Sequence, residues 1–200
     1  MPVACHDEGV AAYDLRVDQA DPARVVTVLP GSGYTAVAPL LWYARAALRD
    51  LGWTVRTLQW TAPPSFSSAR AAYAELLDDD EAPGDDALHL VVAKSIGTLA
   101  MPLAVRLGLP GVWLTPVLTS EQAPDVRETA ADLDENHLLV GGTADPLWDG
   151  DLADGSEADV IEVENADHSL EVPDDRAENL AILDEVVSAI EDFAQSFGEE

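Results

Sequence analysis

The sequence predicts an α/β domain in which a mostly parallel sheet lies between two layers of helices. Short β-branched, apolar segments alternate along the chain with segments of helical periodicity, and prolines and glycines separate the two kinds. This alternation is typical of crossover connections between parallel strands, which place helices on both faces of a sheet. The chain has 200 residues, of which 48% are hydrophobic, so we expect one domain over 1–200 that needs no disulfide or metal for its core.

Each element follows from these two periodicities. Residues 24–29 (RVVTVL) predict a buried strand that ends at Pro30, whereas residues 36–51 have apolar side chains at helical spacing and end at Gly52. Pro102 falls inside an expected helix at 96–107 and predicts a kink or a short first segment, because proline lacks a backbone N–H. Further strands are expected at 54–60, 87–93, 111–117, 137–141 and 159–163, further helices at 67–77 and 176–197, an irregular or helical segment at 120–133, and an outer strand or frayed terminus within 1–20.

The chain is strongly acidic, with 38 aspartates and glutamates against 10 lysines and arginines and a net charge of -28. This charge repels nucleic acid phosphates and anionic membrane surfaces, so we expect neither kind of partner. We interpret the scattered carboxylates as a solvated surface, with recognition of a cationic partner as the alternative. The apolar region 88–118 is interrupted by Lys94 and by prolines, which favours a buried strand-helix-strand unit over a membrane span.

Cysteine usage and the first residues predict a cytoplasmic protein. Cys5 is the only cysteine and cannot form an internal disulfide, and the N-terminal residues lack the basic start and apolar core of a signal peptide. The adjacent residues 5–8 (CHDE) and the acidic stretches 78–86 and 149–159 do not have the ligand spacing of a metal site. We therefore expect no metal.

The stretch Ala93-Lys94-Ser95-Ile96-Gly97 lies where a predicted strand turns into a predicted helix. So sharp a turn forces its central residue toward strained dihedral angles and requires small residues two positions before and after it, as Ala93 and Gly97 are. Ser95 would then project from the carboxyl edge of the sheet at the amino end of a helix, where negative charge is stabilised. Ser95 is therefore a candidate nucleophile, and a helix-capping serine is the alternative interpretation.

An acid and a base follow two later strands. Asp145 lies in the loop after the predicted strand 137–141, and His168 lies in the loop after the predicted strand 159–163. Because the carboxyl ends of parallel strands share one edge, we expect Asp145 to orient His168 and His168 to act as the base for Ser95. Four other acids stay open for the orienting role, and three other histidines lie at a terminus or at strand starts: Asp125, Asp132, Asp134, Asp167, His6, His89 and His137.

The order serine, aspartate, histidine on alternating strands and helices resembles the α/β-hydrolase fold family, over residues 24–197. A fourth matching segment, residues 29–33 (LPGSG), is similar to the oxyanion loop of that family, with Pro30 at a position where histidine is frequent. The resemblance implies a three-layer α/β/α sandwich, a small serine hydrolase that needs no cofactor, and an oxyanion hole made by the backbone N–H groups of Ser32 and Ile96. Because the loop holds a second glycine, Gly33 and Tyr34 stay open as alternatives to Ser32.

Residues 118–136 separate the expected strand 111–117 from the strand that leads to the Asp145 loop. This interval is too short for a separate lid domain, which predicts an open site with a minimal cap. We expect a small-molecule acyl ester or thioester as substrate, with Tyr34, Leu118 and Trp148 as apolar walls. Lys94 is interpreted either as a neighbour that reaches a carboxylate or as a residue that holds the elbow or favours an anionic substrate. The alternative function is a non-catalytic binding or interaction module with the same fold, and the sequence leaves the oligomeric state open.

Overall fold

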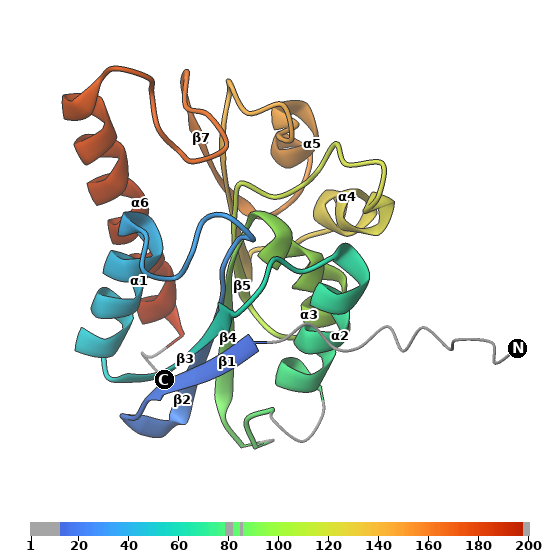
Figure 1. Cartoon of the computed structure of the whole chain (residues 1–200), viewed down its shortest axis with the longest axis vertical. Helices are drawn as coiled ribbons and strands as arrows, with labels where there is room; N and C mark the ends of the chain where they lie inside the picture. The colour runs from blue at the N-terminus through green and yellow to red at the C-terminus, as the bar shows by residue number, and fades with distance from the viewer. Residues whose placement is uncertain (1–12, 79–81, 85, 198–200) are drawn as a thin grey trace, which may run out of the picture.

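A computed structural model describes residues 13–78, 82–84 and 86–197 of the chain (Figure 1). The described residues form one seven-stranded sheet with the strand order β1-β3-β2-β4-β5-β6-β7. Its strands are β1 (Tyr13–Asp18), β2 (Asp21–Leu29), β3 (Trp53–Trp60), β4 (Leu88–Lys94), β5 (Gly111–Leu114), β6 (His137–Gly142) and β7 (Asp159–Val163). The helices are α1 (Pro39–Asp50), α2 (Phe66–Leu77), the 3-10 helix η1 (Ser95–Ala100), α3 (Met101–Arg106), α4 (Pro124–Ala131), α5 (Gly150–Asp154) and α6 (Arg176–Ser196).

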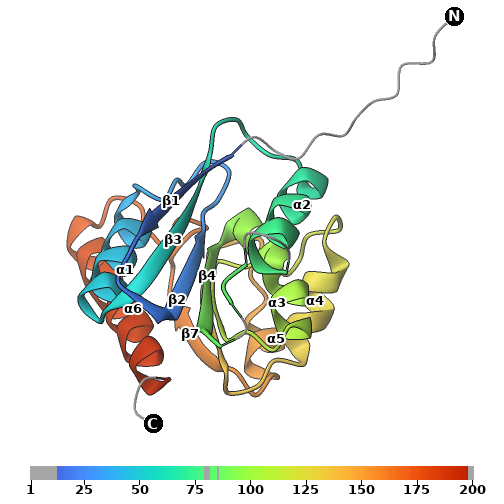
Figure 2. The same ribbon diagram turned by 90° about the horizontal axis from the view of Figure 1, so that it is seen from below.

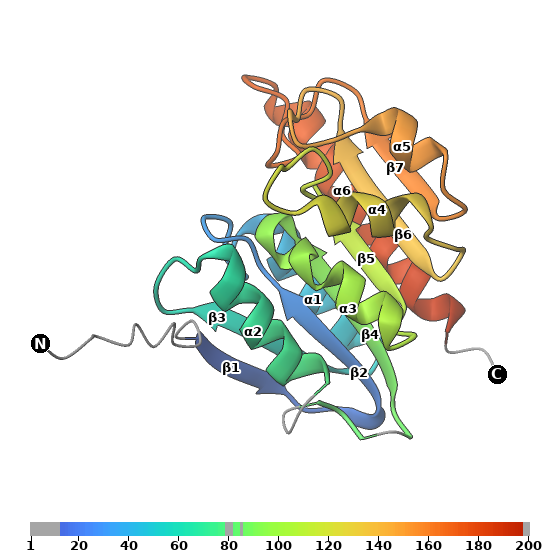
Figure 3. The ribbon, with the colours of Figure 1, turned by 90° about the vertical axis from the view of Figure 1, so that its right-hand side faces the viewer.

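The helices cover both faces of the sheet, so the molecule has three layers. Figure 2 shows α1 and α6 on one side, with α2, α3, α4 and α5 on the other. Figure 3 shows the second layer, α2 to α5, in front of the strands. This arrangement confirms the predicted sandwich with a mostly parallel sheet, because every strand pair is parallel except β1 with β3.

The register places the carboxyl ends of the central strands side by side. Lys94, the last residue of β4, pairs with Leu114 at the end of β5, and Leu114 in turn pairs with Val140 of β6. In β6 and β7, Gly142 pairs with Val163. Loops that leave these strands therefore begin at one edge of the sheet, which is where open α/β sheets place their ligand sites.

Side chains of the central strands alternate between two apolar cores. In β4, Leu90 and Val92 belong to the cluster under α1 and α6, while Val91 and Ala93 belong to the cluster under α2 and α3. This alternation is the two-residue period of a strand that is buried on both faces, and it explains why the segment has an almost continuous apolar run. The same period assigns Lys94 to the α1 and α6 side.

The element boundaries differ from the sequence expectations in places that have local causes. The expected helix 96–107 is divided into η1 and α3, and Pro102 stands in the first turn of α3, which confirms the predicted break. The expected strand 111–117 stops at Leu114 because Thr115 has a positive φ of 42°. Helix α1 begins at Pro39 rather than at residue 36, since proline at a first helical position needs no N–H partner.

The structure bears on two expectations from composition, which concern membrane spans and metal sites. None of the helices in the described part of the chain is both long and apolar enough to cross a membrane. Within residues 13–78, 82–84 and 86–197, no three His, Cys, Asp or Glu side chains are grouped as ligands for one metal ion. The CHDE stretch at 5–8 lies outside the described residues, as does part of the acidic stretch 78–86.

Candidate active site

The turn from β4 into η1 has the geometry that the sequence predicts for a strained elbow. Ser95 has a φ of 55°, in the left-handed region that non-glycine residues rarely adopt. Gly97 has no room for a side chain, because an added Cβ would collide with the carbonyl of Leu29 in the neighbouring strand. Thr98 fixes the turn by donating a hydrogen bond of 2.6 Å to the carbonyl oxygen of Ser95. The hydroxyl of Ser95 is thereby raised above the sheet edge.

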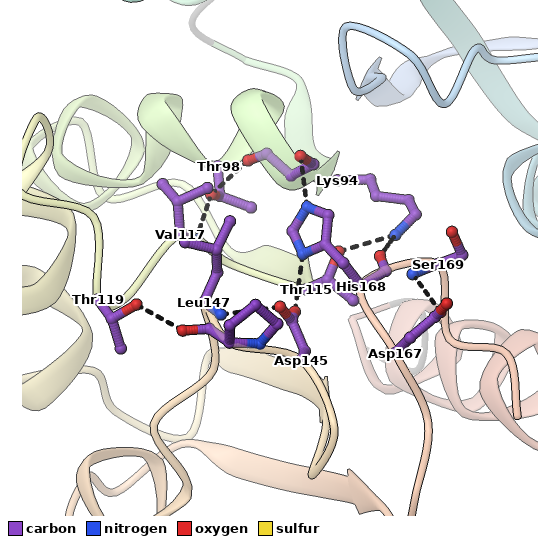
Figure 4. Close-up of polar contacts among 12 residues, drawn as sticks. Lys94, Thr98, Thr115, Val117, Thr119, Asp145, Leu147, Asp167, His168 and Ser169 are labelled. Carbon is purple, nitrogen blue, oxygen red and sulfur yellow. Dashed lines mark hydrogen bonds and ion pairs between the residues drawn. The ribbon is translucent and has the colours of Figure 1, made fainter.

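The imidazole of His168 lies between a hydroxyl and a carboxylate (Figure 4). Its Nε2 is 2.7 Å from Oγ of Ser95, and its Nδ1 is 2.7 Å from Oδ2 of Asp145. Because a carboxylate offers only acceptors, Nδ1 carries the hydrogen and Nε2 is left to accept the hydrogen of the hydroxyl. The structure therefore brings together the three residues that the sequence selects, with the hydrogen-bond pattern of a nucleophile, a base and an orienting acid.

The loop after β6 holds the carboxylate of Asp145 out of water. The Asp145 side chain is 0% exposed, and its other oxygen, Oδ1, accepts a hydrogen bond of 2.8 Å from the backbone N–H of Leu147. Gly142, the last residue of β6, lies so close to Ala166 that an added Cβ would collide with the Ala166 carbonyl. The N–H of Ala144 also donates to that carbonyl at 3.0 Å, so the acid loop and the base loop are hydrogen-bonded to each other.

The base loop after β7 is closed by its own hydrogen bonds. Oδ1 of Asp167 accepts from the N–H of Ser169 at 2.7 Å and from the N–H of Glu171 at 3.3 Å. Leu170 adopts a positive φ of 61° and packs into the core under α1 and α6. His168 is thus presented by a loop that is anchored in the core, and its ring stays 34% exposed to a substrate.

The loop after β2, in which the sequence predicts an oxyanion donor, lies against the elbow. A Cβ built on Gly31 would come within 3.4 Å of the Ser95 Cβ, so this buried glycine allows the loop to approach the nucleophile closely. Ile96 is the second residue of η1, in the first turn, where the N–H groups have no carbonyl partner inside the helix. Ser32, the next residue of the loop, is exposed. The assignment of Ser32 and Ile96 as the two donors stays a prediction, with Gly33 and Tyr34 as alternatives for the loop.

The prediction that Lys94 contacts substrate is wrong. Its side chain is 0% exposed, and its Nζ donates to Oγ1 of Thr115 at 2.7 Å and to the carbonyl oxygen of His168 at 2.8 Å. Nζ also lies 4.7 Å from the centre of the Tyr34 ring. The ammonium neither snorkels to water nor hydrogen-bonds a carboxylate, because the strand alternation turns it into the core. That alternation was the sequence signal for a buried Lys94.

Two of the three predicted apolar walls belong to the core instead. Leu118 is 0% exposed, and Trp148 is 8% exposed and lies so close to Gly141 that no Cβ would fit there. The indole N–H of Trp148 donates to Oε2 of Glu162 at 2.7 Å, which satisfies its one polar atom. Tyr34 is half-buried beside the site. The position of Trp148 and Leu118 in the chain, after predicted strands, does not specify the direction of their side chains.

The other acids and histidines are engaged elsewhere. Asp125 forms a two-bonded ion pair with Arg70 at 2.7 and 2.8 Å, and Asp134 bonds to Asn136. Burial lowers the pKa of His89 to about 3, with the nearby Arg56 as the second cause, and its Nε2 lies 2.8 Å from Oγ1 of Thr27. His137 is the first residue of β6, at the edge of the sheet opposite the triad, and Asp132 follows the end of α4. His6 is outside the described residues.

A cavity of about 720 Å³ opens next to the base loop, between α1 and α6. It begins beside the triad rather than at it, because its lining includes Ser169, the residue after His168, but none of the three triad residues. Its walls are mainly apolar, and its rim is acidic. The apolar lining residues include Leu40, Leu170 and Leu183, and the exposed charged ones, which form the rim, are Glu171, Asp174, Asp175, Asp184 and one cation, Arg176.

The described residues form a mostly parallel sheet between two layers of helices, with a serine, a histidine and an aspartate at its carboxyl edge. Solved structures of α/β hydrolases have a similar fold. A lidless α/β serine hydrolase from Xanthomonas campestris superposes with a TM-score of 0.65 at 16% identity, covering 96% of this chain and 92% of that one. Mouse α/β hydrolase domain-containing protein 10 gives a TM-score of 0.68 at 13% identity, covering 96% and 98%. A dienelactone hydrolase from Anabaena variabilis gives 0.64 at 15% identity, covering 92% and 91%.

The chain therefore has the α/β-hydrolase fold, as the sequence motifs predict. No protein-family model matches the sequence, and a search of curated proteins finds no match. At 13% to 16% identity, these structures establish the shared fold alone.

Proposed function

We propose that this protein is a serine hydrolase that cleaves a small acyl ester or thioester through an acyl-enzyme. The observation that carries the proposal is the position of the His168 imidazole, 2.7 Å from Ser95 Oγ on one side and 2.7 Å from Asp145 Oδ2 on the other. A hydroxyl and a base within this distance are the requirement for nucleophilic catalysis by serine. The structural similarity to esterases and other hydrolases supports the same reaction class.

The reaction would proceed in two steps. Ser95 Oγ bonds to the carbonyl carbon while its proton passes to Nε2 of His168, and the imidazolium then gives this proton to the departing alcohol or thiol as the bond to it breaks. A water molecule, deprotonated by the same imidazole, attacks the acyl-enzyme, and the proton returns to Ser95 as the acid is released. Asp145 holds the ring in the required tautomer and stabilises its charged form.

Backbone N–H groups would stabilise the negative charge that develops on the carbonyl oxygen. We assign this role to Ile96, at the start of η1, and to Ser32, in the loop that contacts the elbow through Gly31. Each such donor contributes roughly 3 to 4 kcal/mol to transition-state stabilisation in other hydrolases. The reaction needs no cofactor.

The surroundings of the site favour a small and uncharged acyl substrate. The segment between β5 and β6 contributes only α4, of eight residues, and no lid domain. The apolar cavity beside Ser169 would hold the hydrocarbon part of the substrate, and its acidic rim disfavours a carboxylate there. This assignment replaces the anionic substrate that a solvent-facing Lys94 would have favoured.

Hydrolysis of p-nitrophenyl esters of increasing chain length, with matched thioesters, tests the proposal. We expect turnover by the wild-type protein and none above background by Ser95→Ala, and the chain-length profile reports the size of the acyl pocket. A fluorophosphonate probe should modify Ser95 in the folded protein, because the probe requires an activated serine. Lack of both turnover and labelling would contradict the proposal and favour a non-catalytic binding module.

A further inference from the structure

Lys94 is the only lysine of the sequence, and it is completely buried next to the proposed nucleophile. Figure 4 shows its side chain running from the elbow toward the loop that carries His168. The ammonium donates to the backbone carbonyl of His168 at 2.8 Å and to the hydroxyl of Thr115 at 2.7 Å. Thr115 directly follows β5, so the ammonium is shared between the ends of two strands and the base loop.

Two consecutive residues thus hold His168 from two sides. Ser95 Oγ contacts the ring at Nε2, and Lys94 Nζ contacts the main chain of the same residue. Lys94 is fixed in the sheet by its pairing with Leu114. Its contact with the His168 carbonyl therefore fixes the distance between the His168 backbone and the end of β4, which leads to the nucleophile. The Tyr34 ring, 4.7 Å from Nζ, adds a contact from the oxyanion loop side.

An ammonium at this position is unfavourable for stability. Burial is the largest effect on Lys94 and lowers its pKa to about 8, while Asp145, Asp167 and Glu171 act in the opposite direction through their charges. A methionine would fill nearly the same space without a charge to desolvate, and replacing buried charged groups by apolar ones is often neutral or stabilising. Packing alone therefore does not account for a lysine here.

We propose that Lys94 is a positioning residue, which fixes the base loop so that the His168 imidazole stays within proton-transfer distance of Ser95. The proposal rests on the proposed hydrolase function. It assigns Lys94 no contact with substrate, because its side chain is closed off from solvent. The base loop is also held by Leu170 in the core and by Asp167, so loss of the lysine contact should displace the loop without unfolding the protein.

The test compares Lys94→Met with Arg45→Met. Arg45 is the matched control, because it is a buried cation of α1 whose hydrogen bonds go to Asp18 and the Ala36 carbonyl and not to the triad or the base loop. For Lys94→Met we expect kcat to fall about tenfold or more with KM changed less than about twofold, since a tether to the base affects proton transfer rather than binding. The rate of fluorophosphonate labelling should fall in parallel. Arg45→Met should keep both rates while lowering thermal stability.

A spectroscopic measurement makes the result independent of turnover and of the variant's folding. Since the chain has one lysine, protein labelled with 15N-lysine gives a single Nζ resonance that needs no assignment. We expect this resonance in the wild-type protein to be protected from hydrogen exchange and to shift when Ser95 is phosphonylated. In Lys94→Met, the ring N–H proton resonance of His168 should exchange faster with water.

The outcomes separate the two proposals. If the wild-type protein neither turns over esters nor reacts with the probe, the hydrolase function is wrong, whatever the lysine resonance does. If the wild-type protein is active and folded Lys94→Met keeps its kcat within about twofold, the positioning role is overturned. A rapidly exchanging Nζ resonance that ignores phosphonylation would overturn it as well, even where the variant does not fold.

Discussion

The carboxylate of Asp145 is completely buried, and its Oδ2 lies 2.7 Å from Nδ1 of His168, 23 residues further along the chain. Its other oxygen accepts the N–H of Leu147, so both oxygens have a donor and the carboxylate has one orientation. This relationship fixes the face of the ring that meets Ser95. It also keeps the ring hydrogen of His168 on Nδ1, so a substitution at Asp145 tests the role of this tautomer directly.

Asp145→Asn should lower kcat by about 10³ to 10⁴ with little change in KM, because the amide can donate to Nδ1 and thereby place the ring hydrogen on Nε2, facing Ser95. Ester hydrolysis measures the effect, and circular dichroism verifies the fold. Asp125→Asn is the control, since that carboxylate pairs with Arg70 outside the triad. Equal activity of the two variants would exclude Asp145 as the orienting acid.

Gly97→Ala should destabilise the protein by roughly 1 to 3 kcal/mol or more and abolish fluorophosphonate labelling. The added methyl group would push against the Leu29 carbonyl of β2, so the elbow must move and the Ser95 hydroxyl moves with it. Gly84→Ala serves as the control because a Cβ there meets no atom within 4 Å. Denaturant unfolding and labelling of both variants check the prediction, which fails if Gly97→Ala is labelled at the wild-type rate.

The stability difference between the wild-type protein and Lys94→Met should change with pH. The pKa of Lys94 falls from 10.5 to about 8 on folding, so between these values the unfolded chain binds the proton and the folded protein does not. The wild type therefore gains stability relative to the variant as pH rises through this window, by about 3 kcal/mol in total. Urea unfolding at both ends of the window measures it. A pH-independent difference would mean that burial does not perturb the lysine.

His89 should make the protein sensitive to acid. Burial, with Arg56 nearby, lowers its pKa from 6.5 to about 3 in the folded protein, so the unfolded chain takes up the proton first as pH falls. The stability present above pH 6.5 is then lost progressively toward pH 3, by up to about 5 kcal/mol. His89→Gln, which does not titrate, should show a shallower loss over the same range. Identical pH profiles of unfolding for the two proteins would refute this.

A neutral ester should be hydrolysed faster than an anionic ester of similar length. The rim of the cavity carries Glu171, Asp174 and Asp184, and the net charge of the chain is -28. We expect kcat/KM for p-nitrophenyl butyrate to exceed that for the p-nitrophenyl hemisuccinate by about fivefold or more at low salt, and the gap to narrow at high salt as the charges are screened. An anionic preference, or a gap that salt leaves unchanged, would contradict the proposed substrate class.

Much of the fold could be predicted because its signals are local. The strand 24–29 and the helix ending at Gly52 are specified by periodicity and by one breaker residue each, and the broken helix after the elbow follows from Pro102. The helix α5 was not predicted, since its five residues are too few to display a helical period. Its N-cap, Asp149, which accepts from the N–H of Leu152, was the one sequence signal for it.

The site also has residues that the sequence predicts and residues that it does not. Ser95, Asp145 and His168 could be selected because each follows a strand, and parallel strands bring their carboxyl ends together whatever the intervening chain does. Leu118 and Trp148 could not be judged correctly, because side-chain direction after a strand depends on the loop conformation. The contact between Lys94 and the His168 carbonyl joins residues 74 positions apart through a backbone atom, which no residue pattern encodes.

The burial of Lys94 also makes the chemical modification of its amine a measure of how often the sheet edge opens. Amine-directed reagents, such as succinimidyl fluorophores, find no lysine side chain at the surface of the folded protein, because the chain's one lysine ammonium is enclosed at the sheet edge. Acylation of that nitrogen requires the strand ends to separate, so the rate of its modification follows the opening of this edge.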